Sequence, residues 1–249
     1  MANDTALPLL TQVGLVIIGD EILSGRRQDS HMSHTITTLG GLGVEVVKIR
    51  VVGDHRQRLT DCLQESRRDG IPTFCFGGIG ATPDDHTRQA AGLAWGVPLV
   101  PHEGAVALLV ERFGRENLYP HRIHLTEFPV GSGLIPNPYN NIAGFYLDHH
   151  WFMPGFPEMA RPMLEWICRT QYRLPGQGMH VRSLVLPHAK EGMVAGILEE
   201  LEAAFSGIKT FSLPKLGENP SLELGVKGGD EAEVDAAFAG LQEKITIVS

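Results

Sequence analysis

A glycine-rich stretch, FCFGGIGATPDDHTR, contains the residue types best suited to chemistry in this sequence. Its glycines are Gly77, Gly78 and Gly80. Glycines at this spacing allow a tight turn whose backbone N–H groups converge on one point, which is a geometry that holds an anion. Thr82 is predicted to cap a helix whose first turn contains Asp84 and Asp85. Because helix N-termini also attract anions, the stretch predicts a phosphate-binding loop.

Carboxylates beside a phosphate site imply a cation between the two, because the negative charges otherwise repel each other. Mg²⁺ and similar ions are held by one or two carboxylates together with phosphate oxygens, and they can activate water for attack on phosphorus. Further acids follow two other predicted strands and are expected at the same place. The candidate metal ligands are Asp20, Glu21, Asp54, Asp84 and Asp85. The sequence therefore predicts a divalent metal cofactor (Mg, Mn or Co).

The same residues also have structural interpretations, and the sequence leaves both kinds open. The segment TPDD is a good helix start by itself, with its acids complementing the helix dipole. Asp20 and Asp54 could cap the turn and the helix that follow them. In LSGR, Ser24 and Gly25 could form a plain turn, or the hydroxyl and the amide could hold phosphate.

Composition and charge narrow the classes of partner. The chain has 249 residues and a formal net charge of −8, and no basic cluster exceeds the pairs Arg26–Arg27 and Arg67–Arg68, so nucleic-acid binding is not expected. Its 3 cysteines form no CxxC pair, which is typical of a reducing compartment. The start of the chain lacks the features of a signal peptide, and no apolar run has the length of a membrane span. We expect a cytoplasmic protein without a membrane partner that binds a small molecule.

The elements that must position these residues alternate regularly. VGLVIIG, residues 13–19, is a continuous apolar run typical of a strand buried on both faces of a parallel sheet. Strands and helices then alternate as far as about residue 96, which predicts a layered α/β fold with right-handed crossovers. The polar segments GDEILSG, VGDHRQ and GGIGATPDD each follow a predicted strand. Since ligands in such folds bind at the carboxyl ends of strands, we expect all three segments to face one cleft.

A Pro/Gly-rich linker, RLPGQG, marks a predicted domain boundary. It separates an α/β domain, residues 1–175, from a second domain, residues 176–249. The second domain has the pattern of a strand, a helix, two strands and a helix, which predicts a small βαββα subdomain.

Five motifs occur in the order and spacing of one family: GDEILSGRRQDS, VGDHRQRL, GGIGATPDDHTR, NPYNNIAGF and MPGFPEM. The chain resembles the molybdopterin-binding-like domain of the competence/damage-inducible protein A (CinA) family, and more distantly MogA and MoaB of molybdenum-cofactor synthesis. The resemblance covers residues 13–173, and residues 180–245 resemble the KH-type subdomain that follows in CinA. It implies a three-layer α/β/α sandwich around a mostly parallel sheet, followed by the small subdomain, and a homo-oligomer.

The resemblance also implies a function. The family's cleft binds a nucleotide- or pterin-linked phosphate compound, and CinA relatives are associated with metal-dependent hydrolysis of the pyrophosphate bond of ADP-ribose or FAD. Asp54 and Asp85 align with acidic positions linked to catalysis in the MogA branch. The predicted binding residues are Ser24, Gly25, Gly77, Gly78, Gly80, Thr82, and Pro154 and Gly155 of the PGFP turn. We therefore expect a divalent-metal-dependent nucleotide pyrophosphatase.

Two alternative functions remain open. The first is a protein that binds or adenylylates molybdopterin, although the KH-like tail favours the CinA branch over the MogA branch. The second is a binding module without catalysis. It is supported by departures from the family pattern at Cys75-Phe76 and at Tyr139–Asn141. The sequence also departs from that pattern at Asp29-Ser30-His31. The chain also ends without the amidase domain of full-length CinA, so no deamidation of nicotinamide mononucleotide is expected.

Overall fold

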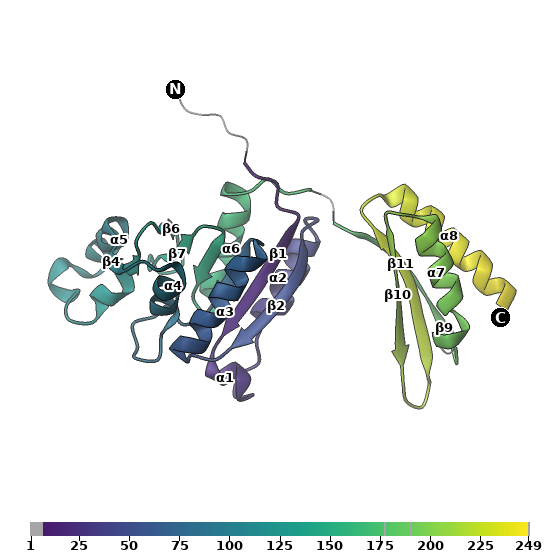
Figure 1. Ribbon diagram of the computed structural model, residues 1–249, viewed down its shortest axis with the longest axis horizontal. Helices are drawn as coiled ribbons and strands as arrows, with labels where there is room; N and C mark the ends of the chain where they lie inside the picture. The colour runs from purple at the N-terminus through teal and green to yellow at the C-terminus, as the bar shows by residue number, and fades with distance from the viewer. Residues whose placement is uncertain (1–6, 177, 190, 249) are drawn as a thin grey trace, which may run out of the picture. The chain divides into compact units, whose positions relative to one another are not determined.

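The structure is a computed structural model that describes residues 7–176, 178–189 and 191–248. The chain forms two compact units, which divide between Pro175 and Gly176, with Gly41–Gly43 belonging to the second unit (Figure 1). Gln177, which is part of the predicted linker, lies outside the described residues.

A six-stranded sheet forms the centre of the first unit, in the order β2-β1-β3-β8-β7-β6. Its strands are β1 (Gln12–Ile18), β2 (Glu45–Val52), β3 (Thr73–Phe76), β6 (Gly133–Ile135), β7 (Gly144–Leu147) and β8 (His150–Met153). The first four strands of the sheet, from β2 to β8, are parallel, whereas β7 and β6 are antiparallel. The predicted, mostly parallel sheet is confirmed. A separate antiparallel pair consists of β4 (Leu99–Pro101) and β5 (Glu127–Pro129).

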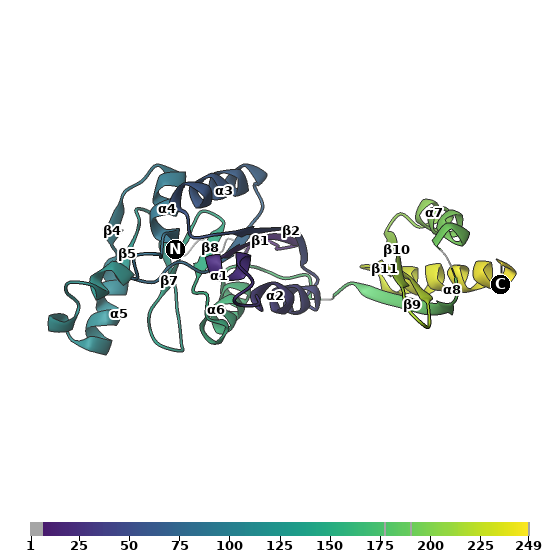
Figure 2. The same ribbon diagram turned by 90° about the horizontal axis from the view of Figure 1, so that it is seen from below.

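Helices cover both faces of this sheet (Figure 2). One face carries α2 (His31–Gly40) and α6 (Pro157–Thr170), and the other carries α3 (Arg56–Asp69) and α4 (Thr87–Trp95). Alternate residues of β1 explain the layers, because Leu15 and Ile17 pack in the core of the first face while Val16 and Ile18 pack in the core of the second. A strand covered on both faces has to be apolar, as β1 is after its exposed first residue, Gln12. The predicted three-layer sandwich is therefore confirmed.

Four further elements complete the described part of the first unit. They are α1 (Asp20–Leu23), α5 (Glu103–Phe113) and two 3₁₀ helices (Arg115–Asn117 and Arg122–Thr126). α3 ends at Gly70 and α4 at Gly96, with φ angles of 66° and 70°. This left-handed conformation favours glycine and stops a helix, so each of these two helices ends at a glycine.

The second unit is a three-stranded antiparallel sheet, in the order β10-β11-β9, packed against two helices. Its elements are β9 (His180–Pro187), a 3₁₀ helix (Glu191–Met193), α7 (Ala195–Ala204), β10 (Ile208–Lys215), β11 (Ser221–Gly228) and α8 (Glu231–Val248). Leu222, Leu224 and Val226 of β11 are fully buried at the centre of its core. The order of elements is the predicted βαββα order. Within the described ranges of both units, no helix is long and apolar enough to cross a membrane.

Candidate functional site

A cavity of about 470 Å³ lies at the carboxyl ends of the parallel strands β1, β2, β3 and β8, at the edge of the sheet where α1 lies (Figure 1). Its walls come from the segments that follow each of these strands, because the ends of parallel strands meet at one edge. The predicted site residues that line it are Glu21, Asp54, Gly77, Gly78, Gly80, Thr82, Asp84, Asp85, Pro154 and Gly155. We call this cavity the cleft.

The other predicted site residues do not line the cleft. Ser24 Oγ donates a hydrogen bond to the carbonyl of Glu21 at 3.4 Å, and Gly25 is exposed. Asp20 is exposed, and its carboxylate accepts the backbone N–H of Asp54 at 3.2 Å. Ser24 and Gly25 therefore do not line the cleft, although the glycine loop does.

The glycine loop, residues 77–81, adopts a backbone that side chains would block. Gly77 and Gly78 have φ angles of 111° and 66°, in the region that favours glycine. A Cβ atom on Gly77 would lie 2.3 Å from the carbonyl oxygen of Ile18, and one on Gly78 would lie 2.3 Å from Thr87 Oγ1. These two glycines are required for the loop to pass between β1 and α4.

The start of α4 holds the carbonyl groups of this loop. Thr87 Oγ1 donates to the carbonyl of Gly77 at 2.9 Å, and Thr87 N donates to the carbonyl of Gly78 at 3.0 Å. Arg88 Nη2 donates to the carbonyl of Gly80. In a trans peptide group the N–H points away from its C=O, so the following amides of residues 78, 79 and 81 are directed away from α4.

The backbone amides of the loop are free in the described part of the chain. Among the described residues, the N–H groups of Gly78, Ile79, Gly80 and Ala81 meet no hydrogen-bond acceptor, and all four residues line the cleft. Consecutive free amides of this kind form an anion-binding concavity. The arrangement can therefore hold a phosphate group through the backbone alone.

The helix start predicted at Thr82 is wrong. The carboxylate of Asp85 accepts hydrogen bonds from both the backbone N–H, at 2.9 Å, and the hydroxyl of Thr82, and Asp85 N donates to the Thr82 carbonyl at 3.0 Å. These bonds close a turn over residues 82–85. Because Thr87 N bonds the Gly78 carbonyl, α4 begins only at Thr87, with His86 at its N-cap. Asp84 and Asp85 thus belong to a turn that borders the cleft.

Two of the acids hold each other's backbone. Asp20 N donates to Asp54 Oδ2 at 2.8 Å, while Asp54 N donates to Asp20 Oδ1 at 3.2 Å. Burial raises the pKa of Asp54, the N–H of Asp20 opposes this rise, and the charges of Asp20, Glu21 and Asp84 add to it. No group of three or more His, Cys, Asp or Glu side chains in the described part of the chain is arranged to hold a metal ion. The predicted metal ligands therefore do not form a preorganised metal site.

A smaller cavity, of about 310 Å³, adjoins the cleft and shares Glu21, Arg27 and Gly155 with it. The rings of His31 and Phe76 line it and stack on each other, with centroids 4.6 Å apart and planes inclined by 19°. Burial lowers the pKa of His31, so its neutral form is favoured. Two residues that depart from the family pattern are thus in contact with each other beside the cleft.

Sequence reasoning missed several residues that shape the cleft. Arg27, Asn137, Ile142 and Met159 line it. Asn137 is only 3% exposed, and its side chain donates to Asn140 Oδ1 at 2.8 Å and to the carbonyl of Ile142 at 3.0 Å. The run NPYNN was a signal for this loop, since Asn side chains commonly fix turns. No pattern in the sequence marked Arg27 or the buried Thr87 and Arg88.

A larger cavity, of about 640 Å³, lies at the opposite edge of the sheet, before β3 and β8. Arg67, which lines it, donates to the carbonyl of Ala94 at 2.6 Å and lies 4.5 Å from the centroid of the Trp95 ring. Arg67 and Arg68, which both line this cavity, also complement the dipole at the end of α3. These contacts engage Arg67 within the protein, so this cavity is not the candidate site.

Comparisons with known proteins identify the family and the fold of the first unit. The family model described as "Probable molybdopterin binding domain" matches residues 14–174. A CinA-like protein of Geobacter metallireducens is 31% identical over 207 residues, which are 79% of this chain and 50% of that protein. A CinA-like protein of Solibacter usitatus is 28% identical over 251 residues, 94% of this chain and 58% of that protein. The chain thus spans about half the length of the curated relatives that it matches.

A solved structure supports the fold. The crystal structure of the protein CinA from Thermoplasma acidophilum has a TM-score of 0.60 with this chain and 22% sequence identity. The match covers 65% of this chain and 99% of that chain. At this identity, the likeness shows that the two share a fold.

Proposed function

We propose that the cleft binds the phosphate of a nucleotide- or pterin-linked small molecule. The chain belongs to the molybdopterin-binding-domain family of CinA-like proteins. The observation that carries this proposal is the row of free amides at residues 78–81, which line the cleft and lack an acceptor among the described residues. An anion bound in the cleft would satisfy all four amides together.

The proposed reaction is hydrolysis of a pyrophosphate bond, as in ADP-ribose or FAD. A water oxygen would attack one phosphorus, the bond from that phosphorus to the bridging oxygen would break, and the bridging oxygen would leave on the other phosphate. The loop amides would stabilise the charge that develops on the phosphoryl oxygens. Asp54 borders the cleft with a raised pKa, which suits a carboxylate that accepts the proton of the attacking water.

The residues present do not fit a resident metal ion, because the described part of the chain has no cluster of three ligands. Asp20, Asp54 and Asp85 are moreover already hydrogen-bonded within the protein. A divalent ion would therefore have to enter with the phosphate and use one or two carboxylates, as Mg²⁺ commonly does. No step of the proposed reaction is assigned to it.

A second candidate function is the binding of molybdopterin, which the description of the matching family favours. Molybdopterin carries a phosphate, so the same amides would hold it. A catalytically inactive binding module would use the cleft in the same manner. The cytoplasmic location expected from the composition and the homo-oligomeric state implied by the resemblance belong to this proposal as well.

The deciding experiment is a hydrolysis assay on the full chain. ADP-ribose, FAD and NAD are incubated with Mg²⁺, Mn²⁺, Co²⁺ or a chelator, and the release of AMP is measured for wild type, Asp54→Asn and Ser24→Ala. The hydrolase proposal predicts turnover that Asp54→Asn abolishes and that Ser24→Ala, outside the cleft, retains. Absence of turnover in every condition, with ligand binding still detectable by calorimetry, would leave a binding protein and refute hydrolysis.

A further inference from the structure

We propose that Arg88 is a positioning residue of the cleft, whose buried and unpaired guanidinium holds the glycine loop and strengthens its affinity for phosphate. This inference rests on the proposed phosphate-binding function. Arg88 does not line the cleft, but it is hydrogen-bonded to Gly80, which does.

Arg88 is buried to an unusual degree for an arginine. Its side chain is 2% exposed, and no other fully buried side chain among the described residues is larger. Nη2 donates to the carbonyl of Gly80, whereas Nε and Nη1 are buried and find no acceptor in the described part of the chain. Arginine is almost never fully buried unless it is paired, so this arrangement has a cost.

The charge of Arg88 is also incompletely balanced. Within the described ranges it forms no ion pair, and Glu127 and Asp85 are the acids whose charges act on it. Asp85 is already hydrogen-bonded to Thr82. Burial lowers the pKa of Arg88 while the two acids raise it, but a guanidinium stays protonated in proteins. The first unit therefore keeps a buried positive charge behind the loop.

An anion in the cleft would offset this charge. The Gly80 carbonyl that accepts from Arg88 and the N–H of Ala81 belong to one peptide group. The guanidinium therefore fixes the direction of that N–H and polarises it toward the cleft. Because the attraction between charges grows where water is excluded, the same guanidinium adds directly to the affinity for phosphate.

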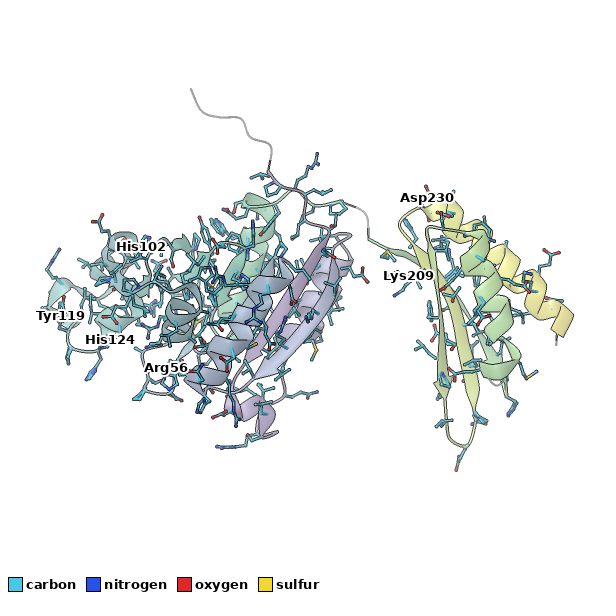
Figure 3. The ribbon with its side chains drawn as sticks, in the orientation of Figure 1. Arg56, His102, Tyr119, His124, Lys209 and Asp230 are labelled. Carbon is cyan, nitrogen blue, oxygen red and sulfur yellow. The ribbon has the colours of Figure 1, made fainter. Side chains whose placement is uncertain are left out.

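The test separates charge from hydrogen bonding by comparing Arg88→Lys with Arg88→Gln. Lysine keeps the charge, whereas glutamine keeps a donor for the Gly80 carbonyl. The matched control is Arg56→Gln, because Arg56 is an exposed arginine at the same edge of the sheet that does not line the cleft (Figure 3). It removes the same charge from the surface, where solvent screens it.

Binding of ADP-ribose and of inorganic pyrophosphate to the full-length variants is measured by calorimetry. The proposal predicts that Arg88→Gln weakens binding by about tenfold or more, equivalent to about 1.4 kcal/mol, while Arg88→Lys and Arg56→Gln stay within about threefold of wild type. Urea unfolding without ligand adds a second measurement, because a purely structural role of Arg88 would lower the urea concentration at which the variants unfold. Arg88→Gln should unfold at the wild-type urea concentration or above it, because it removes an unpaired buried charge.

The outcomes are distinct. If wild type binds neither probe, the proposed function fails, and the inference fails with it. If wild type binds and Arg88→Gln binds equally well, only the inference is overturned. If Arg88→Lys and Arg88→Gln lose affinity equally and both unfold at lower urea, Arg88 is structural and the inference is again overturned.

Discussion

The buried histidine at the start of β8 makes the stability of the first unit depend on pH. His150 is 3% exposed, its Nε2 lies 2.9 Å from Ser66 Oγ, and its ring meets that of Trp95 edge-on at 5.0 Å. Burial lowers its pKa from 6.5 to about 4, with Asp148 opposing this and nearby cations adding to it. The folded state therefore favours the neutral ring.

The sign and size of the effect follow from linkage. Because the folded pKa lies below the unfolded one, the unfolded chain binds more protons between pH 6.5 and about 4. The stabilisation is complete above pH 6.5 and is lost as the pH falls toward 4. At about 1.4 kcal/mol for each pH unit between the two values, the total is about 3 kcal/mol, of which about 2 kcal/mol is lost at pH 5.

Urea unfolding monitored by tryptophan fluorescence measures this loss in the first unit alone. The chain has 3 tryptophans, and all of them, Trp95, Trp151 and Trp166, lie in that unit. Between pH 7.5 and pH 5, wild type should lose about 2 kcal/mol more stability than His150→Gln, in which the titrating ring is absent. Equal losses in the two proteins would refute the reasoning, whatever their stabilities at pH 7.5.

Three further substitutions test the site and the division of the chain. Gly78→Ala should cost more than about 1–2 kcal/mol in urea unfolding, because alanine must adopt a left-handed φ and its Cβ would meet Thr87 Oγ1, and should abolish ADP-ribose binding in calorimetry. Thr87→Val leaves the Gly77 carbonyl without its donor and should lower stability by about 1–3 kcal/mol, whereas Thr87→Ser, which keeps the hydroxyl, should not. Leu224→Ala should destabilise the second unit by about 2–5 kcal/mol in circular dichroism while leaving the tryptophan transition unchanged; a joint shift would contradict independent units.

The parallel half of the fold was predictable because its signals are local and repeated. The apolar run of β1 marks a strand covered on both faces, and Gly70 and Gly96 mark the helix ends. The antiparallel edge formed by β7 and β6 was not, because its strands have 4 and 3 residues and lie in a Gly- and Pro-rich segment. Strands this short carry no measurable period.

The candidate site was likewise predictable only in part from the sequence. Strand order explains why the segments after β1, β2 and β3 meet at one cleft. The role of Thr82 was mispredicted, because the local signal for a helix cap does not reveal that Asp85 binds its hydroxyl and its amide. The burial of Arg88 could not be predicted, because a charged residue in the first turn of a helix is expected to face solvent. Only tertiary packing buries it.

The most direct test of phosphate binding by the loop is an NMR titration of the ¹⁵N-labelled full chain with ADP-ribose. The amide resonances of Gly78, Ile79, Gly80 and Ala81 should shift downfield together and saturate with one dissociation constant, because each N–H gains an acceptor. Saturable shifts confined to the cavity at the opposite edge, around Arg67 and Asp148, would contradict the assignment of the cleft. Unchanged loop amides at saturating ligand would contradict it equally.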